Sequence, residues 1–280
     1  MKKGFIIAAV ILVVAGTLIF AIAFIASDFD FSRLDTDEYE TNTYALNEDF
    51  ETIEIISKEA NIILKNSDNQ KPSVDCVERT KVRYDVYVKN GVLKIIVVDN
   101  RSWYDYLTLF SFRPQSITVY LPSNFYKSLT VKTSTGDINI DDFRAEMINL
   151  SVSTGKICGR NIECAKTFST EVSTGKISLT DIMCKSFISI GSTGDITLKN
   201  VLASDECNIK RNTGDVIFDN CDALKLTVRT STGDVTGTLR SEKNFIAKTS
   251  TGKINVPDTN SGGKCEITTS TGDILIELTR

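Results

Sequence analysis

Residues 129–280 alternate between apolar and polar positions around a recurring glycine. The phrase Ser-Thr-Gly-Asp/Lys-Ile, or a close variant, occurs eight times. Ile or Val stands two residues after every glycine, and apolar residues stand seven and often five residues before it. A period of two on both sides of a glycine is typical of strand, turn and strand. The glycines, 19 or 20 residues apart, are Gly136, Gly155, Gly175, Gly194, Gly214, Gly233, Gly252 and Gly272.

This repeat predicts an all-β fold. One rung of about 20 residues cannot bury its apolar face alone, whereas stacked rungs bury a continuous core. With strands about 4.8 Å apart, eight rungs would form a rod roughly 40 Å long. The sequence therefore predicts a single-stranded parallel β-solenoid, or β-helix, over 129–280, with each rung pairing with its neighbours.

Stacking also explains the phrase itself. We expect the eight glycines to be structural turns, because a sharp corner that recurs in every rung needs backbone angles that a Cβ disfavours. The Ile/Val column fills the interior. The next column reads Asp or Lys, and its mixed signs limit the repulsion between stacked like charges. Its side chains point outward, so the candidate surface contacts are Asp137, Asp195, Asp215 and Asp234.

Residues 50–128 lack the glycine phrase but also alternate, and Asn90-Gly91 is a hairpin signal. We expect irregular N-terminal rungs and a cap, since the end repeats of solenoids are atypical. Within this region, 101–115 is rich in aromatic residues. It is predicted either to plug the open end of the stack or to expose a patch for a partner or the membrane interface. The candidate contacts of such a patch are Trp103, Tyr104 and Tyr106.

The N-terminus predicts one transmembrane helix. An uncharged run of 23 residues extends from Gly4 to Ala26. It is long enough to cross a bilayer and longer than the usual apolar stretch of a signal peptide, so we expect a retained anchor within 1–27, with a cleaved signal peptide as the alternative. Lys2 and Lys3 precede the run, and an acidic segment follows, predicted as a spacer over 28–49. Positive charge stays cytoplasmic, so 28–280 should lie outside the cell membrane.

Composition argues against several functions. The chain of 280 residues has no histidine, a net charge of −4 and no dense Lys/Arg cluster. The commonest general base and zinc ligand are therefore missing, and a nucleic-acid partner is not expected. Seven cysteines occur without a CxxC pair, so we expect small core residues, with their disulfide status open. We predict no enzyme activity, catalytic residue, cofactor or resident metal.

Two alternatives stay open. Asp195, Asp215 and Asp234 lie on three successive rungs, where calcium could bind along the column. A carbohydrate-active β-helix would need paired carboxylates in a groove, and adjacent-rung Asp pairs satisfy the distance in any solenoid. That pattern is weak evidence for an enzyme.

The strand-rich start, Val119 to Pro122 (VYLP), and the SLTVKTSTGDINI stretch with its further rungs resemble a bacterial β-strand-repeat family labelled "putative adhesin". The resemblance covers roughly residues 50–280. It implies a domain of unknown function, often membrane-tethered, that binds at the cell surface, and it supplies no catalytic residues. We expect a non-enzymatic binding or scaffolding domain for a glycan or protein partner. An envelope-stress sensor acting through protein partners is the alternative.

Overall fold

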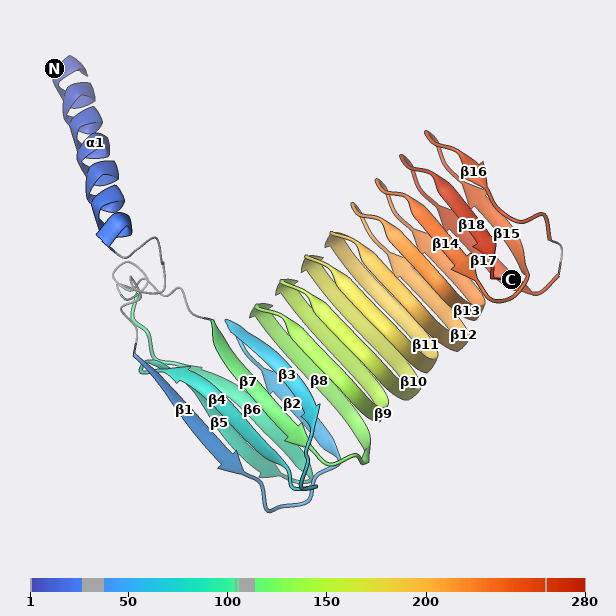
Figure 1. Cartoon of the computed structure of the whole chain (residues 1–280), viewed down its shortest axis with the longest axis horizontal. Coiled ribbons are helices and arrows are strands. Elements are labelled where there is room, and N and C mark those ends of the chain that lie inside the picture. The colour runs from blue at the N-terminus through green and yellow to red at the C-terminus, as the bar shows by residue number, and fades with distance from the viewer. Residues whose placement is uncertain (1, 27–37, 104, 106–113, 260, 280) are drawn as a thin grey trace.

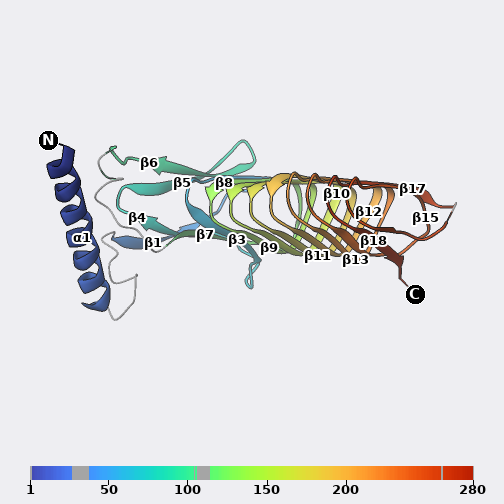
Figure 2. The same cartoon turned by 90° about the horizontal axis from the view of Figure 1, so that it is seen from above.

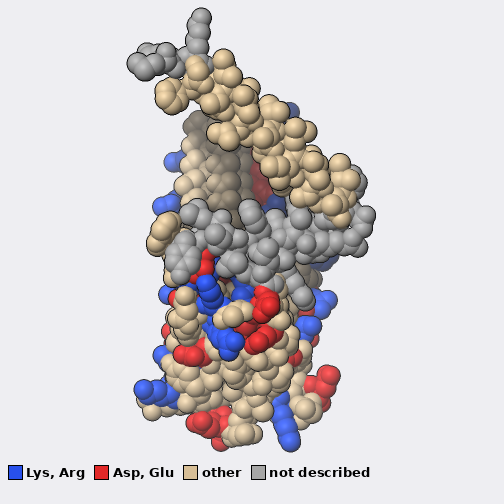
Figure 3. Space-filling view, turned by 90° about the vertical axis from the view of Figure 1, so that its left-hand side faces the viewer, with Lys and Arg blue, Asp and Glu red and all other residues tan. Residues whose placement is uncertain are grey.

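An apolar helix precedes the β part of the chain (Figure 1). The computed structural model describes residues 2–26, 38–103, 105, 114–259 and 261–279. Helix α1 (Lys2–Ala26) includes 23 residues long and apolar enough to cross a membrane. Figure 3 shows it as a tan surface above a β domain on which Lys and Arg lie among Asp and Glu. No α1 residue belongs to the buried core, so a fragment of residues 38–280 keeps the whole core and should fold alone.

Seven strands come before the regular rungs. They are β1 (Tyr39–Ala45), β2 (Thr52–Ile56), β3 (Ala60–Asn66), β4 (Ser73–Arg79), β5 (Val82–Lys89), β6 (Val92–Asp99) and β7 (Gln115–Leu121). Strands β1, β4 and β7 pair antiparallel, and so do β5 and β6. Asn90 and Gly91 form the β5–β6 turn, both at positive φ. The two antiparallel groups extend the two faces of the stack, because β7 continues through β3 and β6 through β2.

The predicted acidic spacer is shorter than the sequence suggested. Strand β1 lies inside 28–49 and pairs with β4 over seven residues. Its burial alternates between half-buried and exposed, as expected for an edge strand with one side on the core. Acidic composition concealed this alternation. Residues 27–37 lie outside the described part.

The rungs stack in parallel and in register, which confirms the β-solenoid (Figure 2). Their strands are β8 (Phe125–Thr135), β9 (Ile138–Thr154), β10 (Ile157–Thr174), β11 (Ile177–Thr193), β12 (Ile196–Lys210), β13 (Val216–Arg229), β14 (Val235–Leu239), β15 (Lys243–Lys248), β16 (Ile254–Asn255), β17 (Gly263–Thr268) and β18 (Ile274–Leu278). Equivalent positions meet, as Ile157 does with Ile177 and Phe168 with Phe187. Each sequence column therefore becomes a line of touching side chains.

The last two rungs exchange places. Strands β17 and β18 pair directly with β13 and β14, and β15 and β16 then pair with β17 and β18. The C-terminal rung is thus inserted between its two predecessors, as Figure 1 shows for β18 and β16. The expected strictly sequential stacking is wrong at this end, because the two rungs carry the same columns and fit in either order.

The exchange leaves the seventh rung at the tip of the rod. Ile254 belongs to the Ile/Val column, whose other members are at most 1% exposed, yet 46% of its surface is accessible. Phe245 is only partly buried, whereas Phe168 and Phe187 are fully buried. Lys248 and Lys253 are exposed on this edge rung. Lysines on an edge disfavour pairing with another chain, so they protect an end whose core is incompletely covered.

A rung without glycine lies at the opposite end of the stack. Strand β3 pairs with β9, and Ile62 aligns with Ile138 of the interior column. Asn61 Oδ1 accepts a hydrogen bond of 2.9 Å from the Asp137 amide, so Asn61 stands where later rungs have Asp. Ala60 replaces the glycine and is not among the residues with positive φ. The corner column therefore begins one rung before the first glycine phrase.

One buried cation, Arg211, has no ion pair among those described for the chain. Arg211 is 1% exposed, and its Nη1 donates to the Val172 carbonyl at 3.3 Å, while Nε and Nη2 have no partner among the described residues. Burial lowers the pKa of Arg211 to about 10. The guanidinium occupies space left by Gly191, where a Cβ would lie 1.7 Å from Nη1. The absence of a side chain at Gly191 thus provides the space that the large Arg211 side chain needs on the neighbouring rung.

We expect Arg211→Met to be neutral or to stabilise the fold by up to about 2 kcal/mol. Methionine fills most of the same space and removes a buried charge that lacks a carboxylate partner, a replacement that is often neutral or favourable. Urea unfolding of the 38–280 fragment measures the change. Lys210→Met, at the exposed last residue of β12 directly before Arg211, is the control and should shift stability by less than about 0.5 kcal/mol. A loss above 1 kcal/mol in Arg211→Met would contradict the prediction.

Candidate functional site

The eight glycines form a corner where adjacent rungs approach closely. Each has a φ between 119° and 152°. A Cβ built on Gly175 would lie 1.7 Å from the carbonyl oxygen of Gly155 in the preceding rung, and a Cβ on each of the other seven would meet a neighbouring carbonyl oxygen at 1.9–2.2 Å. Both the backbone angle and the lack of space therefore demand glycine. This column serves the stacking of the rungs.

The candidate aspartates form a ladder beside that corner. Asp137, Asp215 and Asp234 each accept a hydrogen bond of 2.7–2.8 Å from the backbone amide of the next rung, through Oδ1. Asp195 accepts a longer one, of 3.2 Å, from the Asp215 amide. These donors offset the repulsion within the run of stacked carboxylates. One oxygen of each aspartate is thus committed to the fold, while the other is not used by this ladder.

Lysine interrupts the ladder and neutralises part of its charge. Lys176 Nζ lies 2.9 Å from Asp195 Oδ2. The pKa of Asp195 is lowered, chiefly by the hydrogen bond from Lys176. Asp195 is therefore an ion-pair partner as well as a ladder member. Of the four predicted contacts, it is the one least free to bind a further cation.

A second ladder was missed by the sequence analysis. Asn or Asp stands six residues after each of the first five glycines and adopts a left-handed conformation with φ of 51–59°, which these residue types tolerate. Asn161 donates to Asp142 at 2.5 Å, and Asn200 to Asp181 at 2.7 Å. The sequence indicates this ladder through Asn or Asp residues that stand at a fixed distance after the glycines. The ladder defines a second corner in these five rungs.

The predicted aromatic patch is described in part. Trp103 is 76% exposed, so its ring lies largely in solvent. Tyr104 and Tyr106 lie outside the described residues, as do 107–113. The structure therefore neither brings the three aromatic residues together nor separates them.

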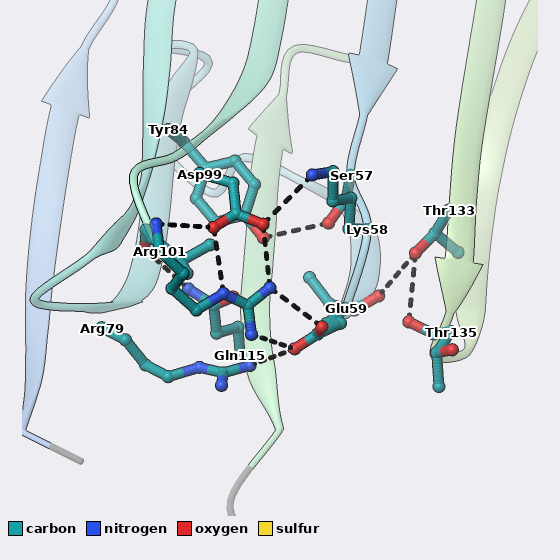
Figure 4. A network of polar contacts seen from close by, with 12 residues as sticks. Ser57, Lys58, Glu59, Arg79, Tyr84, Asp99, Arg101, Gln115, Thr133 and Thr135 are labelled. Carbon is teal, nitrogen blue, oxygen red and sulfur yellow. Dashed lines mark hydrogen bonds and ion pairs between the residues drawn. The ribbon is translucent and has the colours of Figure 1, made fainter. Parts of the chain in front are cut away.

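An ion network ties the N-terminal strands to the first rung (Figure 4). Arg101 lies between two carboxylates, 2.9 Å from Asp99 Oδ2 and 3.0 Å from Glu59 Oε1. Arg79 contacts the other Glu59 oxygen at 2.6 Å. Glu59 also bridges to Thr135 through the backbone, next to the first glycine corner. Four segments distant in sequence therefore meet around one carboxylate.

The network holds its carboxylates ionised. The hydrogen bond from Arg101 is the main cause that lowers the pKa of Asp99. Burial alone would raise the pKa of Glu59, but hydrogen bonds and charge from Arg101 and Arg79 outweigh it and lower the value. Since every charge has an opposite partner within the network, this cluster is built to hold strands together. It does not resemble an acid/base pair with separated pKa values.

We expect Glu59→Gln to destabilise the 38–280 fragment by about 1–2 kcal/mol at pH 7, because it removes charge-assisted hydrogen bonds at a site that is one-third exposed. A lowered folded-state pKa means that the stabilisation is present above the ordinary value of 4.5 and is lost as pH falls. The difference from wild type should therefore shrink towards pH 2 in urea unfolding. Glu40→Gln, at an exposed ion pair, is the control and should change little at either pH.

The rest of the described chain offers little for catalysis. All seven cysteines are free thiols, six of them buried, and burial raises the pKa of Cys184 and Cys265 to about 12. In the described ranges no group of three or more Cys, Asp or Glu side chains is arranged to hold a metal. Thiolate chemistry is disfavoured by these pKa values. What the structure presents instead is a rod with structural ladders at its corners.

Comparison with solved structures shows the same fold. A candidate adhesin of Bacteroides fragilis is 16% identical, with a TM-score of 0.49, and the match covers 86% of this chain and 97% of the other. A candidate lipid-binding protein of Parabacteroides distasonis is also 16% identical, with a TM-score of 0.50, covering 88% of this chain and 98% of the other. At this identity the likeness concerns architecture alone. None of the curated proteins matches the sequence.

The family assignment follows from the repeat region. The Toastrack DUF4097 family model matches residues 50–280, the whole span over which the glycine rungs and the strands before them resemble bacterial adhesin-like repeats. The match includes the antiparallel strands β4 to β7 as well as the stack. Most of the chain is thereby covered, and the chain belongs to the Toastrack DUF4097 family.

Proposed function

We propose that this chain is a non-enzymatic binding or scaffolding module, anchored in the cell membrane by α1 and exposed outside it. One observation supports this proposal most directly. The helix α1 is apolar and contributes no residue to the buried core, whereas the β domain contains the whole core. Lys2 and Lys3 before the helix favour a cytoplasmic N-terminus. Cell-surface molecules would then meet the sides of the rod.

The exposed groups of the β domain support the binding of a partner rather than catalysis. The second carboxylate oxygens of Asp137, Asp215 and Asp234 and the exposed ring of Trp103 remain our candidate contacts for a glycan or protein. Carboxylates and an exposed aromatic ring suit hydrogen bonding and stacking with such partners. A role as an envelope-stress sensor would use the same surfaces with one membrane protein as partner.

A topology experiment tests the anchor. The full-length chain with a C-terminal tag is expressed in bacteria, and protease is added to spheroplasts with intact membranes. We expect the tag to be digested and the α1 segment to stay with the membrane. A tag protected until detergent is added would contradict the proposed orientation, and a soluble, shortened chain would show a cleaved signal sequence instead.

A binding experiment tests the module. The 38–280 fragment is mixed with isolated cell-envelope material, and co-sedimentation is measured alongside release of soluble glycan products. Saturable binding without product is the expected result. Product release would overturn the non-enzymatic assignment, and capture of a single dominant membrane protein would favour the sensor role.

A further inference from the structure

A groove of about 570 Å³ opens on one side of the rod near its C-terminal end. It lies where irregular positions within β11, β12 and β13 meet the connection from β14 to β15. These positions are marked by register shifts, between Cys184 and Ser186 in one rung and between Ala203 and Glu206 in the next. The connection exists because the chain leaves the stack at Leu239 to reach the tip. The groove is therefore a product of the exchanged rung order.

Apolar side chains form the long part of the groove. Leu224 is 63% exposed and Met183 57%, and no large apolar side chain described beyond α1 exceeds them except Trp103. Leu202 is half-buried and lies on the rung between theirs, opposite Met183 in the register. The floor consists of small residues, Cys184, Ala203 and Ala223, each at most 7% exposed. Two highly exposed apolar side chains over one small-residue floor form a track for a narrow apolar ligand.

The other end of the groove is basic. Lys243 is 2% exposed, and its ammonium group pairs with Asp222, so these two charges cancel. Arg240 is exposed, and its Nε donates to the Asn220 carbonyl at 3.2 Å. None of the ion pairs described for the chain involves Arg240. One positive charge, on a planar group with further donors, is left at the end of the apolar track.

We propose that this groove binds a single-chain fatty-acid carboxylate, with the chain along Met183, Leu202 and Leu224 and the carboxylate at Arg240. A guanidinium pairs with one carboxylate through two parallel hydrogen bonds, and the net charge of the polar end, +1, matches one such head. The volume falls within the range of about 300–1,000 Å³ typical of small-ligand pockets. The proposal rests on the proposed binding function and specifies one ligand and one site for it.

Dodecanoate is the probe, titrated below its micelle concentration into the 38–280 fragment and followed by calorimetry. We expect saturable one-to-one binding. Leu224→Glu places a charge on the apolar track at a position that tolerates exposure, and it should abolish detectable binding. Arg240→Glu should weaken dodecanoate at least about tenfold, yet leave an uncharged glucoside of the same chain length unaffected. Ile190→Glu, at a similarly exposed site on β11 away from this groove, is the control and should bind as wild type does.

Absence of saturable dodecanoate binding overturns the proposal, and so does unchanged affinity in Leu224→Glu. Equal loss for the acid and the glucoside in Arg240→Glu would also overturn the assigned carboxylate site. Circular dichroism of each variant shows whether it retains the β fold, and Leu224→Gln provides a second, uncharged test of the track with an expected weaker loss. Binding to envelope material is measured in parallel. If that binding persists while dodecanoate fails, the groove assignment is wrong and the proposed function stands.

Discussion

Deleting residues 263–280 is expected to unfold the seventh rung as well as the eighth. Among the described strands, β15 pairs only with β17 and β16 only with β18, so removal of the last rung leaves the rung before it without sheet partners. The deletion also removes four side chains that are at most 2% exposed: Cys265, Ile267, Ile274 and Ile276. At about 1.5–3 kcal/mol for each buried apolar side chain, the loss is on the order of 6–12 kcal/mol.

Hydrogen exchange measures this result by segment. In the truncated 38–262 fragment, the amides of β15 and β16 should exchange as fast as an unfolded peptide, while β9 to β12 keep their protection. The reciprocal variant deletes 243–260 and joins Glu242 to Ser261. There β17 and β18 should stay protected, because they pair directly with β13 and β14. Protection of β15 after loss of 263–280 would show that the rungs stack in sequence order.

Gly175→Ala is expected to cost at least about 3 kcal/mol and to separate the rungs on either side of it. The added Cβ meets a backbone carbonyl oxygen at 1.7 Å, and that oxygen belongs to a neighbouring rung that is itself fixed by pairing on both sides. A positive φ of 144° adds strain for any residue with a Cβ. Neither the clash nor the backbone strain can be relieved without breaking the pairing of β10 and β11.

The matched control is Gly91→Ala. Gly91 also has a positive φ, of 72°, but no atom lies within 4 Å of its ideal Cβ position. Its cost should be limited to backbone strain, about 1–2 kcal/mol. Urea unfolding of both variants in the 38–280 fragment gives the comparison. Equal losses at the two positions would mean that close approach between rungs is not what requires glycine at Gly175.

The regular part of the fold could be predicted because each column has one physical reason. A glycine at every corner and Ile or Val two residues later locate the turn and the interior, and the register pairs Ile157 with Ile177 as this spacing requires. The Asx column, which includes Asn161 and Asp181, is regular over the first five rungs. The alternation of apolar residues does not predict this column, because that alternation says nothing about polar positions with left-handed backbone angles.

The order of the last rungs could not be predicted from the columns. Gly252 and Gly272 stand in the same phrase, so either rung satisfies the corner and the interior beside Gly233. Contacts between residues distant in sequence distinguish the two rungs. Lys243 forms an ion pair with Asp222, and Gly263 lies against the Leu224 backbone, where a Cβ would meet a carbonyl oxygen at 1.9 Å. The Leu224 and Arg240 groove depends on that order and was hidden for the same reason.

The inserted C-terminal rung also limits how such a rod can change its length. A further rung added at the tip of the rod would have to pair with β15 and β16, along an edge that carries Lys248 and Lys253. Duplications between β9 and β12, where each rung follows its predecessor, meet no such barrier. Repeat number should therefore vary through the middle of the rod, while its tip is inherited as a fixed closing unit.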